Sequence, residues 1–273
     1  MSLGIAIKAP EGLVLAVDSR LTLIGNNADV SSIAVHFDNA TKLLSFSKPN
    51  DYIGVVTYGQ AVIGLRTAQS FVPEFESALL GVDAPPQRAM QRLSVHEFAT
   101  RLSAFYRHQW QASMPAEYTG PDMTFLVAGF DDGAPYGKLF EINIPRKPDP
   151  FEHYGVPGAF GIVWGGQREI VDRLIQGVDG RLRSLLLQME LPPEAKQQIE
   201  TLLGQIPLPI PLLALPLQDC IDLAIFFIKT TISAHNLSLT IRGVGGPIDV
   251  AIITRTAGLQ FVQRKVITGE QQR

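Results

Sequence analysis

The sequence predicts an α+β fold built on antiparallel sheets. Strand-like segments occur in groups rather than alternating one by one with helices, and short turn sequences join several neighbouring strands. Grouped elements favour antiparallel sheets over a doubly wound parallel sheet. With 273 residues, of which 46% are hydrophobic, the chain can bury a full core without disulfides or metals.

The first elements are two predicted hairpins. Leu3–Lys8 and Leu13–Asp18 are short apolar runs separated by a turn that contains proline and glycine. Lys42–Ser47 and Tyr52–Thr57 form the second pair, around a turn of the same kind. We expect each pair to form adjacent antiparallel strands.

Two helices are predicted next. Helical periodicity begins near Gln60 and ends at Gly81. The second helix begins at Ser94 and Glu97, which form a capping box that satisfies free amides at the helix start. An apolar stripe from Phe98 to Tyr106 then predicts the buried face of this helix.

The rest of the chain returns to strands, then helices, then strands. Strands are predicted at Met123–Phe130, Lys138–Ile144 and Phe160–Trp164. Helices are predicted at Gln167–Ile175, Leu182–Met189, Glu194–Leu203 and Leu217–Ala234, the last after the proline-rich connector Ile206–Leu217. A closing hairpin is predicted from Ile248–Thr254 and Leu259–Lys265. We read the connector as a subunit contact or as a segment buried within its own chain.

Composition excludes several classes of function. A net charge of -3 argues against a nucleic-acid-binding surface, and the longest apolar window is too short and too rich in proline to span a membrane. The single cysteine, Cys220, excludes a disulfide framework and indicates a reducing compartment. No phosphate-binding loop or metal-ligand spacing is present. We therefore expect a cytoplasmic protein without cofactor, metal, nucleic-acid or membrane partner.

The beginning of the chain carries the most specific pattern. Ser2-Leu-Gly-Ile-Ala-Ile-Lys8 and Gly12-Leu-Val-Leu-Ala-Val-Asp-Ser-Arg20 resemble the opening of proteasome β-type subunits and their bacterial relatives. In that family a nucleophilic threonine or serine at the mature amino terminus is followed sixteen residues later by Asp-Ser-Arg. Ser2 and Asp18 have this spacing. Met1 precedes a small residue, so we expect its removal to expose Ser2.

Later segments extend the resemblance over most of the chain. Lys42–Phe46 and Tyr52–Gly59 are similar to the strands that carry a lysine and an oxyanion amide in the family. Thr231–Ser238 together with the Gly-Pro-Ile-Asp sequence ending at Asp249 is most similar to the Anbu-type bacterial proteasome homologues. The resemblance implies one domain over residues 1–273, a four-layer αββα sandwich of two antiparallel sheets (the N-terminal nucleophile hydrolase fold), with a helical and proline-rich insertion at about 177–216.

The resemblance also implies a mechanism. A serine hydroxyl needs an adjacent base, and a free α-amine on Ser2, with an ordinary pKa of about 8, can be that base. Lys42 would lower the pKa of the amine, because a nearby cation disfavours its protonation. Asp18 would hold Lys42 charged and oriented. The backbone N–H of Tyr58 would stabilise the oxyanion.

Three further residues receive roles from the same resemblance. Arg20 would support the catalytic residues without contacting the substrate itself. Thr22 matches a position that hydrogen-bonds the substrate backbone, and Val56 matches a side wall of the specificity pocket. Packing and strand pairing are equally good explanations for Tyr58 and Thr22.

Two positions depart from the family pattern. The Gly-Ser-Gly turn of the family reads Trp164-Gly-Gly-Gln167 here, and its Asp-x-x-Ser-Gly-Gly reads Ile241-Arg-Gly-Val-Gly-Gly246. The polar groups that would steady the terminal amine are therefore missing.

These departures leave two hypotheses for the function. The first is a peptidase that cleaves amide bonds of peptides or unfolded proteins through Ser2, inside a homo-oligomeric ring or helical array. The second is a catalytically silent subunit with a structural or binding role. A small-molecule amidase of the same fold is a third class, and the sequence leaves open whether an ATPase partner supplies the substrate.

Overall fold

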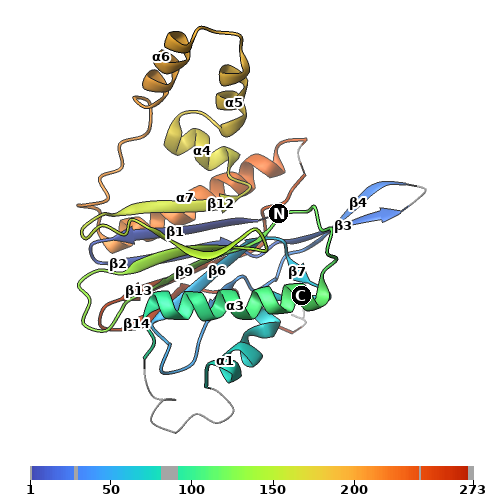
Figure 1. Ribbon diagram of the computed structural model, residues 1–273, viewed down its shortest axis with the longest axis vertical. Helices are drawn as coiled ribbons and strands as arrows, with labels where there is room; N and C mark the ends of the chain where they lie inside the picture. Colours follow the sequence, from blue (N-terminus) through green and yellow to red (C-terminus); the bar gives the residue numbers. More distant parts are fainter. Residues whose placement is uncertain (1, 28–29, 81–91, 240, 270–273) are drawn as a thin grey trace.

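Two antiparallel sheets form the body of the protein (Figure 1). The computed structural model describes residues 2–27, 30–80, 92–239 and 241–269. The first sheet has the order β12 (Gly161–Gly166), β1 (Leu3–Ala9), β2 (Gly12–Asp18), β13 (Ile248–Thr254) and β14 (Gly258–Gln263). The second has the order β11 (Lys147–His153), β10 (Lys138–Ile144), β9 (Met123–Gly129), β6 (Ile53–Gly59) and β5 (Leu43–Ser45).

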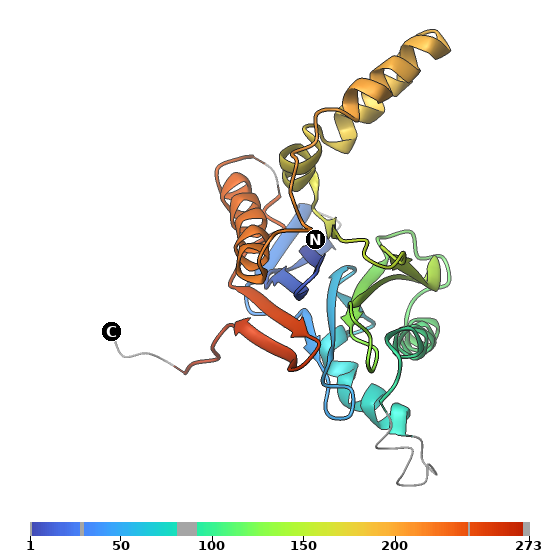
Figure 2. The same ribbon diagram turned by 90° about the vertical axis from the view of Figure 1, so that its left-hand side faces the viewer.

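Each sheet has one face against helices and one face against the other sheet. The helix α7 (Leu217–Asn236) packs on β1, β2 and β13, whereas α3 (Val95–Ser113) packs on β9, β10 and β11. Figure 2 shows α7 and α3 on opposite sides of the paired sheets. The helix α1 (Val72–Leu80) joins α3 on the second sheet through Phe75, whose ring stands edge-on to Phe98.

Strands β1 and β2 are buried over their whole length, as expected for strands between a helix and a second sheet. Alternate residues of β1 face opposite ways: Ile5 packs with α7, and Ala6 packs between the sheets. Gly4 lets the sheets approach closely, since a Cβ there would lie 2.7 Å from side-chain atoms of both Tyr58 and Val56.

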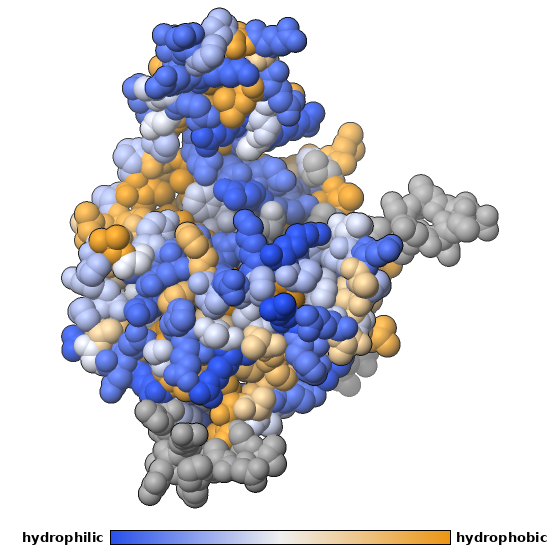
Figure 3. Space-filling model, in the orientation of Figure 1, coloured by the Kyte–Doolittle hydropathy of each residue, from blue (hydrophilic) through white to orange (hydrophobic). Residues whose placement is uncertain are grey.

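Two hairpin-like segments project from this body (Figure 1). The strands β3 (Leu21–Asn27) and β4 (Val30–Phe37) pair with each other. The second projection, which we call the helical arm, contains α5 (Gly180–Gln188) and α6 (Pro193–Leu203) and follows α4 (Glu169–Gln176). Arg183 of α5 pairs with Glu200 of α6. In Figure 3 apolar side chains lie among polar ones on the arm; Leu185 is 55% exposed and Leu202 61% exposed.

The structure confirms the α+β class and most predicted strands. The capping box is confirmed on its serine side, since the Glu97 N–H donates to the Ser94 hydroxyl at 3.1 Å. The predicted helix start near Gln60 is wrong, because β7 (Val62–Ile63), β8 (Arg66–Thr67) and the 3₁₀ turn η1 (Ala68–Phe71) occupy that segment before α1 begins. The predicted end at Gly81 lies outside the described residues.

Five strands of the described ranges escaped prediction, namely β3, β4, β7, β8 and β11. β11 has the sequence Lys-Pro-Asp-Pro-Phe-Glu-His and lacks the apolar alternation that marks a half-buried strand. It lies at the edge of the second sheet, where proline is tolerated because one row of backbone donors needs no partner strand. Among the helices of the described ranges, none is long and apolar enough for a membrane span.

Neighbouring phenylalanines on α7 test this packing. Phe227 is fully buried against the first sheet, whereas Phe226 is 51% exposed. We expect Phe227→Ala to lower the free energy of unfolding by about 3–5 kcal/mol, because it leaves a cavity in the core. Phe226→Ala should lower it by less than about 1 kcal/mol. Urea denaturation of the two variants measures the difference, and equal losses would contradict the assignment of the α7 face.

Candidate active site

Ser2 lies at the start of β1, between the neighbouring strands β2 and β12. Its residue is 5% exposed, and its backbone carbonyl accepts a hydrogen bond from the Gln167 N–H at 2.7 Å. Gly166 adopts a left-handed φ of 94°, and a Cβ at this position would overlap the Ser2 carbonyl oxygen. The glycine therefore allows the turn after β12 to close on the backbone of Ser2.

Asp18, at the end of β2, accepts hydrogen bonds from four separate parts of the chain. Its Oδ1 accepts from the Leu3 N–H and from Lys42 Nζ, each at 3.0 Å. Its Oδ2 accepts from the Gly245 N–H at 3.0 Å and from the Arg20 N–H at 3.1 Å. The carboxylate is fully buried, and these four donors replace the water that it loses.

Lys42 precedes β5 and reaches Asp18 from the second sheet. Its ammonium group also donates to the backbone carbonyl of Arg20. Burial lowers the pKa of Lys42, and the attraction of Asp18 opposes this effect. The positive charges of Lys265 and Arg20 lower the pKa further. Lys42 is thus a buried cation that depends on one carboxylate for its compensating charge.

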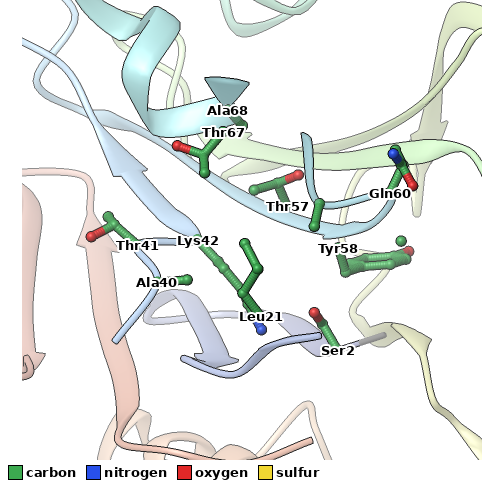
Figure 4. Close-up of a pocket in the computed structure, with 12 residues that line it drawn as sticks. Ser2, Leu21, Ala40, Thr41, Lys42, Thr57, Tyr58, Gln60, Thr67 and Ala68 are labelled. Carbon is green, nitrogen blue, oxygen red and sulfur yellow. The ribbon is translucent and has the colours of Figure 1, made fainter. Parts of the chain in front are cut away.

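The structure brings Lys42 close to the start of the chain. Lys42 Nζ and the Leu3 N–H donate to the same oxygen of Asp18, so the two nitrogens lie within two hydrogen-bond lengths of each other. Ser2 and Lys42 also line one pocket, which holds about 340 Å³ including space open to solvent. Figure 4 shows the Ser2 hydroxyl pointing into this pocket. Ser2, Asp18 and Lys42, which the sequence singled out, therefore share one site.

Tyr58 lines the same pocket from β6. Its side chain packs between the sheets, and burial raises the pKa of the phenol. Gly165 leaves room for this ring, since a Cβ there would overlap the Tyr58 hydroxyl. Gly59 follows with a φ of 86° and also borders the pocket. The backbone at the end of β6 thus turns at the pocket wall.

The three supporting residues have different positions. Arg20 forms a bidentate pair with Asp38, in which Nε donates to Oδ1 at 2.5 Å and Nη2 donates to Oδ2 at 2.8 Å. Thr22 pairs through its hydroxyl with Nδ1 of His36 at 3.0 Å, on the β3–β4 hairpin. Val56 is fully buried between the sheets. None of these three is among the described residues that line the pocket.

Other residues occupy the pocket walls. The lining residues beyond the predicted ones are Leu21, Ala40, Thr41, Thr57, Gly59, Gln60, Ala61, Thr67 and Ala68. Four of them, Gln60, Ala61, Thr67 and Ala68, come from the segment that was predicted to be helical. Thr57 and Gly59 lie in Tyr52–Gly59, the strand that the family resemblance had indicated. In the described part of the chain, no group of three or more metal-binding side chains could hold an ion.

The two departures from the family pattern have local structural consequences. Val244 is fully buried and packs with Ile248 and α7, so an apolar side chain fills the place expected for a serine. The following Gly245 supplies its N–H to Asp18 and its carbonyl to the Ser19 N–H at 3.1 Å. Here the backbone, rather than a side chain, contacts the acidic residue.

Two glycines with left-handed backbone test how tightly the Ser2 region is closed. Gly158 has a φ of 76° with open space around it, whereas Gly166 has a φ of 94° with the Ser2 carbonyl beside it. We expect Gly158→Ala to cost only the backbone strain, about 1–2 kcal/mol. Gly166→Ala should cost at least about 2 kcal/mol more, because strand β12 must shift. Thermal and urea unfolding measure both, and equal effects would contradict the close contact.

Comparison with known proteins supports a single fold. No protein-family model matches the chain, and no curated protein matches either. Among solved structures, Anbu from Hyphomicrobium sp. strain MC1 matches with a TM-score of 0.59 and 14% identity, over 96% of this chain and 86% of that chain.

Two further structures agree. The Anbu complex from Pseudomonas aeruginosa, described as a helical assembly, matches with a TM-score of 0.59 and 18% identity, over 98% of this chain and 88% of that chain. Anbu from Yersinia bercovieri, described as an ancestral beta-subunit, matches with a TM-score of 0.54 and 17% identity, over 95% and 86% respectively. The chain therefore has the fold of the Anbu proteins, as the resemblance in the sequence predicted.

Proposed function

We propose that this protein is a proteasome-like hydrolase that cleaves amide bonds with Ser2 as its nucleophile, once Met1 has been removed. The observation that carries the proposal is that Ser2 and Lys42 line one pocket and that Lys42 forms a buried ion pair with Asp18. Lys42 donates to the same Asp18 oxygen as the amide next to Ser2, so a buried ammonium group lies close to the start of the chain.

The proposed chemistry uses the α-amine of Ser2 as the base. The neutral amine takes the hydroxyl proton while Oγ attacks the substrate carbonyl carbon. The amine then gives this proton to the leaving nitrogen, the carbon–nitrogen bond breaks, and an ester on Ser2 remains. Water hydrolyses the ester by the same route in reverse. Lys42 would lower the pKa of the amine by charge repulsion, so that more of it is neutral at physiological pH.

Backbone amides at the end of β6 would stabilise the oxyanion. Tyr58 is the donor implied by the family resemblance, and its residue borders the pocket together with Gly59. Such donors act most strongly where water is excluded. The side-chain wall at this strand would be Thr57, since Val56 faces the inter-sheet core. Thr22 lies on the β3–β4 hairpin and not in the pocket lining, so it would contact the substrate only where the substrate runs along that hairpin.

The pocket favours an uncharged substrate side chain. Apart from Lys42, which Asp18 neutralises, the described residues that line it have uncharged side chains, and Leu21, Ala61 and Ala68 are apolar. A charged group entering this pocket would lose water without gaining an ion-pair partner. We therefore place a small uncharged residue of a peptide or unfolded protein in it, and keep a small-molecule amide as the other substrate class.

The architecture is part of the proposal. The order α7, first sheet, second sheet and α3 fits the four-layer αββα sandwich of N-terminal nucleophile hydrolases. We propose that residues 1–273 form one such domain, with about 177–216 as an insertion. A homo-oligomeric array is supported by the helical assembly of the related Pseudomonas protein. The free, buried Cys220 is in keeping with a reducing cytoplasm.

A catalytically silent assembly subunit is the second candidate. The specific observation in its favour is that two positions where the family has serine lack a hydroxyl here: Val244 is buried at one, and Gly165 lies against Tyr58 at the other. In that case the same fold would assemble and bind without reacting.

A covalent-labelling experiment separates the two candidates. We expect an electrophilic peptide with an uncharged side chain to add one equivalent of mass to the wild-type protein, on a peptide that begins with Ser2. Ser2→Ala should reduce labelling at least ~100-fold, because the nucleophilic oxygen is gone. Ser77→Ala, an exposed serine on α1, is the matched control and should label like wild type.

Intact mass completes the experiment. Protein that has lost Met1 and labels on Ser2 supports the hydrolase. Protein that has lost Met1 but reacts equally with and without Ser2 favours the silent subunit. Retention of Met1 in protein purified from its own host would overturn the proposed mechanism, because the Ser2 nitrogen would be an amide.

A further inference from the structure

A second buried ion pair lies beside the first. Lys265, in the segment after β14, pairs with Asp249 of β13, and their side chains are only 7% and 3% exposed. The Lys265 N–H also donates to Asp249 Oδ1 at 2.8 Å, so main chain and side chain hold the same carboxylate. The next residue, Val266, is 80% exposed. Lys265 thus points inward from an otherwise exposed segment.

This pair is connected to the candidate site through Ser19. Lys265 Nζ lies 3.4 Å from the Ser19 hydroxyl, and Ser19 is fully buried directly after Asp18. The Ser19 carbonyl accepts from the Ala40 N–H at 2.9 Å, and Ala40 lines the pocket. Asp249 stands opposite Val17 in the β2–β13 register, one residue from Asp18. The second ion pair therefore supports the turn that sets Asp18 in place.

The charges around Lys42 come from every element that packs against it. Asp18 attracts its proton, whereas Arg20 and Lys265 repel it. Asp38 faces Lys42 from the end of β4, although Arg20 holds this carboxylate. His235, in the last turn of α7, faces Asp18 from the other side of the first sheet, and burial lowers the pKa of this imidazole. Lys265 is the most remote of these groups in sequence.

We infer that Lys265 is a positioning residue for the Ser2 site. Together with Asp249 and Ser19 it fixes the turn after Asp18. Its ammonium group also adds a second positive charge near Lys42. The inference rests on the proposed function for its effect on rate. Its effect on Lys42 is independent of any reaction. A buried ion pair by itself is weak evidence for stability, so the influence on its neighbours is what distinguishes this role.

The sign of the effect follows from the charges. Removing the Lys265 cation makes protonation of Lys42 and of the Ser2 amine easier, and it leaves the Asp249 anion nearby, which acts in the same direction. The neutral amine needed as the base then forms only at higher pH. The labelling rate of the variant should therefore begin to rise at a higher pH than the rate of the wild-type protein.

The experiment measures labelling rate against pH in matched variants. We expect Lys265→Met to move the midpoint of the rising limb upward by about 0.5–1 pH unit and to slow labelling at pH 7 by about 3–10-fold. Lys265→Arg, which keeps the charge, should restore most of the rate. Arg264→Met, which removes an exposed cation one residue away, should match wild type. Where Lys265→Met fails to fold, the double variant Asp249→Asn/Lys265→Met should give a shift in the same direction.

A second readout does not depend on activity. Titration of Lys42, followed by carbon NMR of its Cε and assigned with Lys42→Arg, should show a higher midpoint in Lys265→Met than in wild type. A shift of Lys42 without labelling of wild type would reject the proposed function and keep the inference. Labelling of wild type with an unchanged Lys42 midpoint, or an equal shift in Arg264→Met, would overturn the inference.

Discussion

The buried carboxylate of Asp18 is the constraint on which the site depends. A fully buried anion requires donors for both oxygens, and here they come from β1, from the turn after β2, from the segment before β5 and from the Gly245 loop. Satisfying this one side chain therefore holds three segments that are distant in sequence, β1, the segment before β5 and the Gly245 loop, around the end of β2. Lys42 is among these donors, so the charge that neutralises Asp18 also becomes a cation at the pocket that Ser2 lines.

The sheets supply the rigidity that this arrangement needs. β1 is a fully buried strand between β2 and β12, which leaves Ser2 little freedom at its start. Glycines permit the close approaches: Gly4 brings the sheets together, and Gly166 closes the β12 turn on Ser2. Where the family has polar side chains, this chain uses backbone groups of the Gly245 loop. Positioning by backbone is compatible with a site that has lost those side chains.

The sequence predicted the parts that local patterns encode. The hairpin of β1 and β2, the helix cap at Ser94 and the spacing of Ser2 and Asp18 all follow from short stretches of chain. The pocket walls do not, because Thr57 and Thr67 meet only through tertiary folding. The segment from Gln60 had helical periodicity, yet it becomes helical only from Ala68, and Val62 and Ile63 lie in the short strand β7. The buried position of Lys265 could not be predicted from the sequence either, since a lysine near a strand end is normally solvated.

The proposed mechanism requires the Ser2 nitrogen to be an α-amine and to lie beside a buried cation. Nitrogen NMR of protein labelled at serine, titrated with pH, measures this amine directly. We expect an amine signal for Ser2 whose pKa lies below the ordinary α-amino value of about 7.7–8.0. An amide signal at this nitrogen, or a pKa at or above the ordinary value, would contradict it.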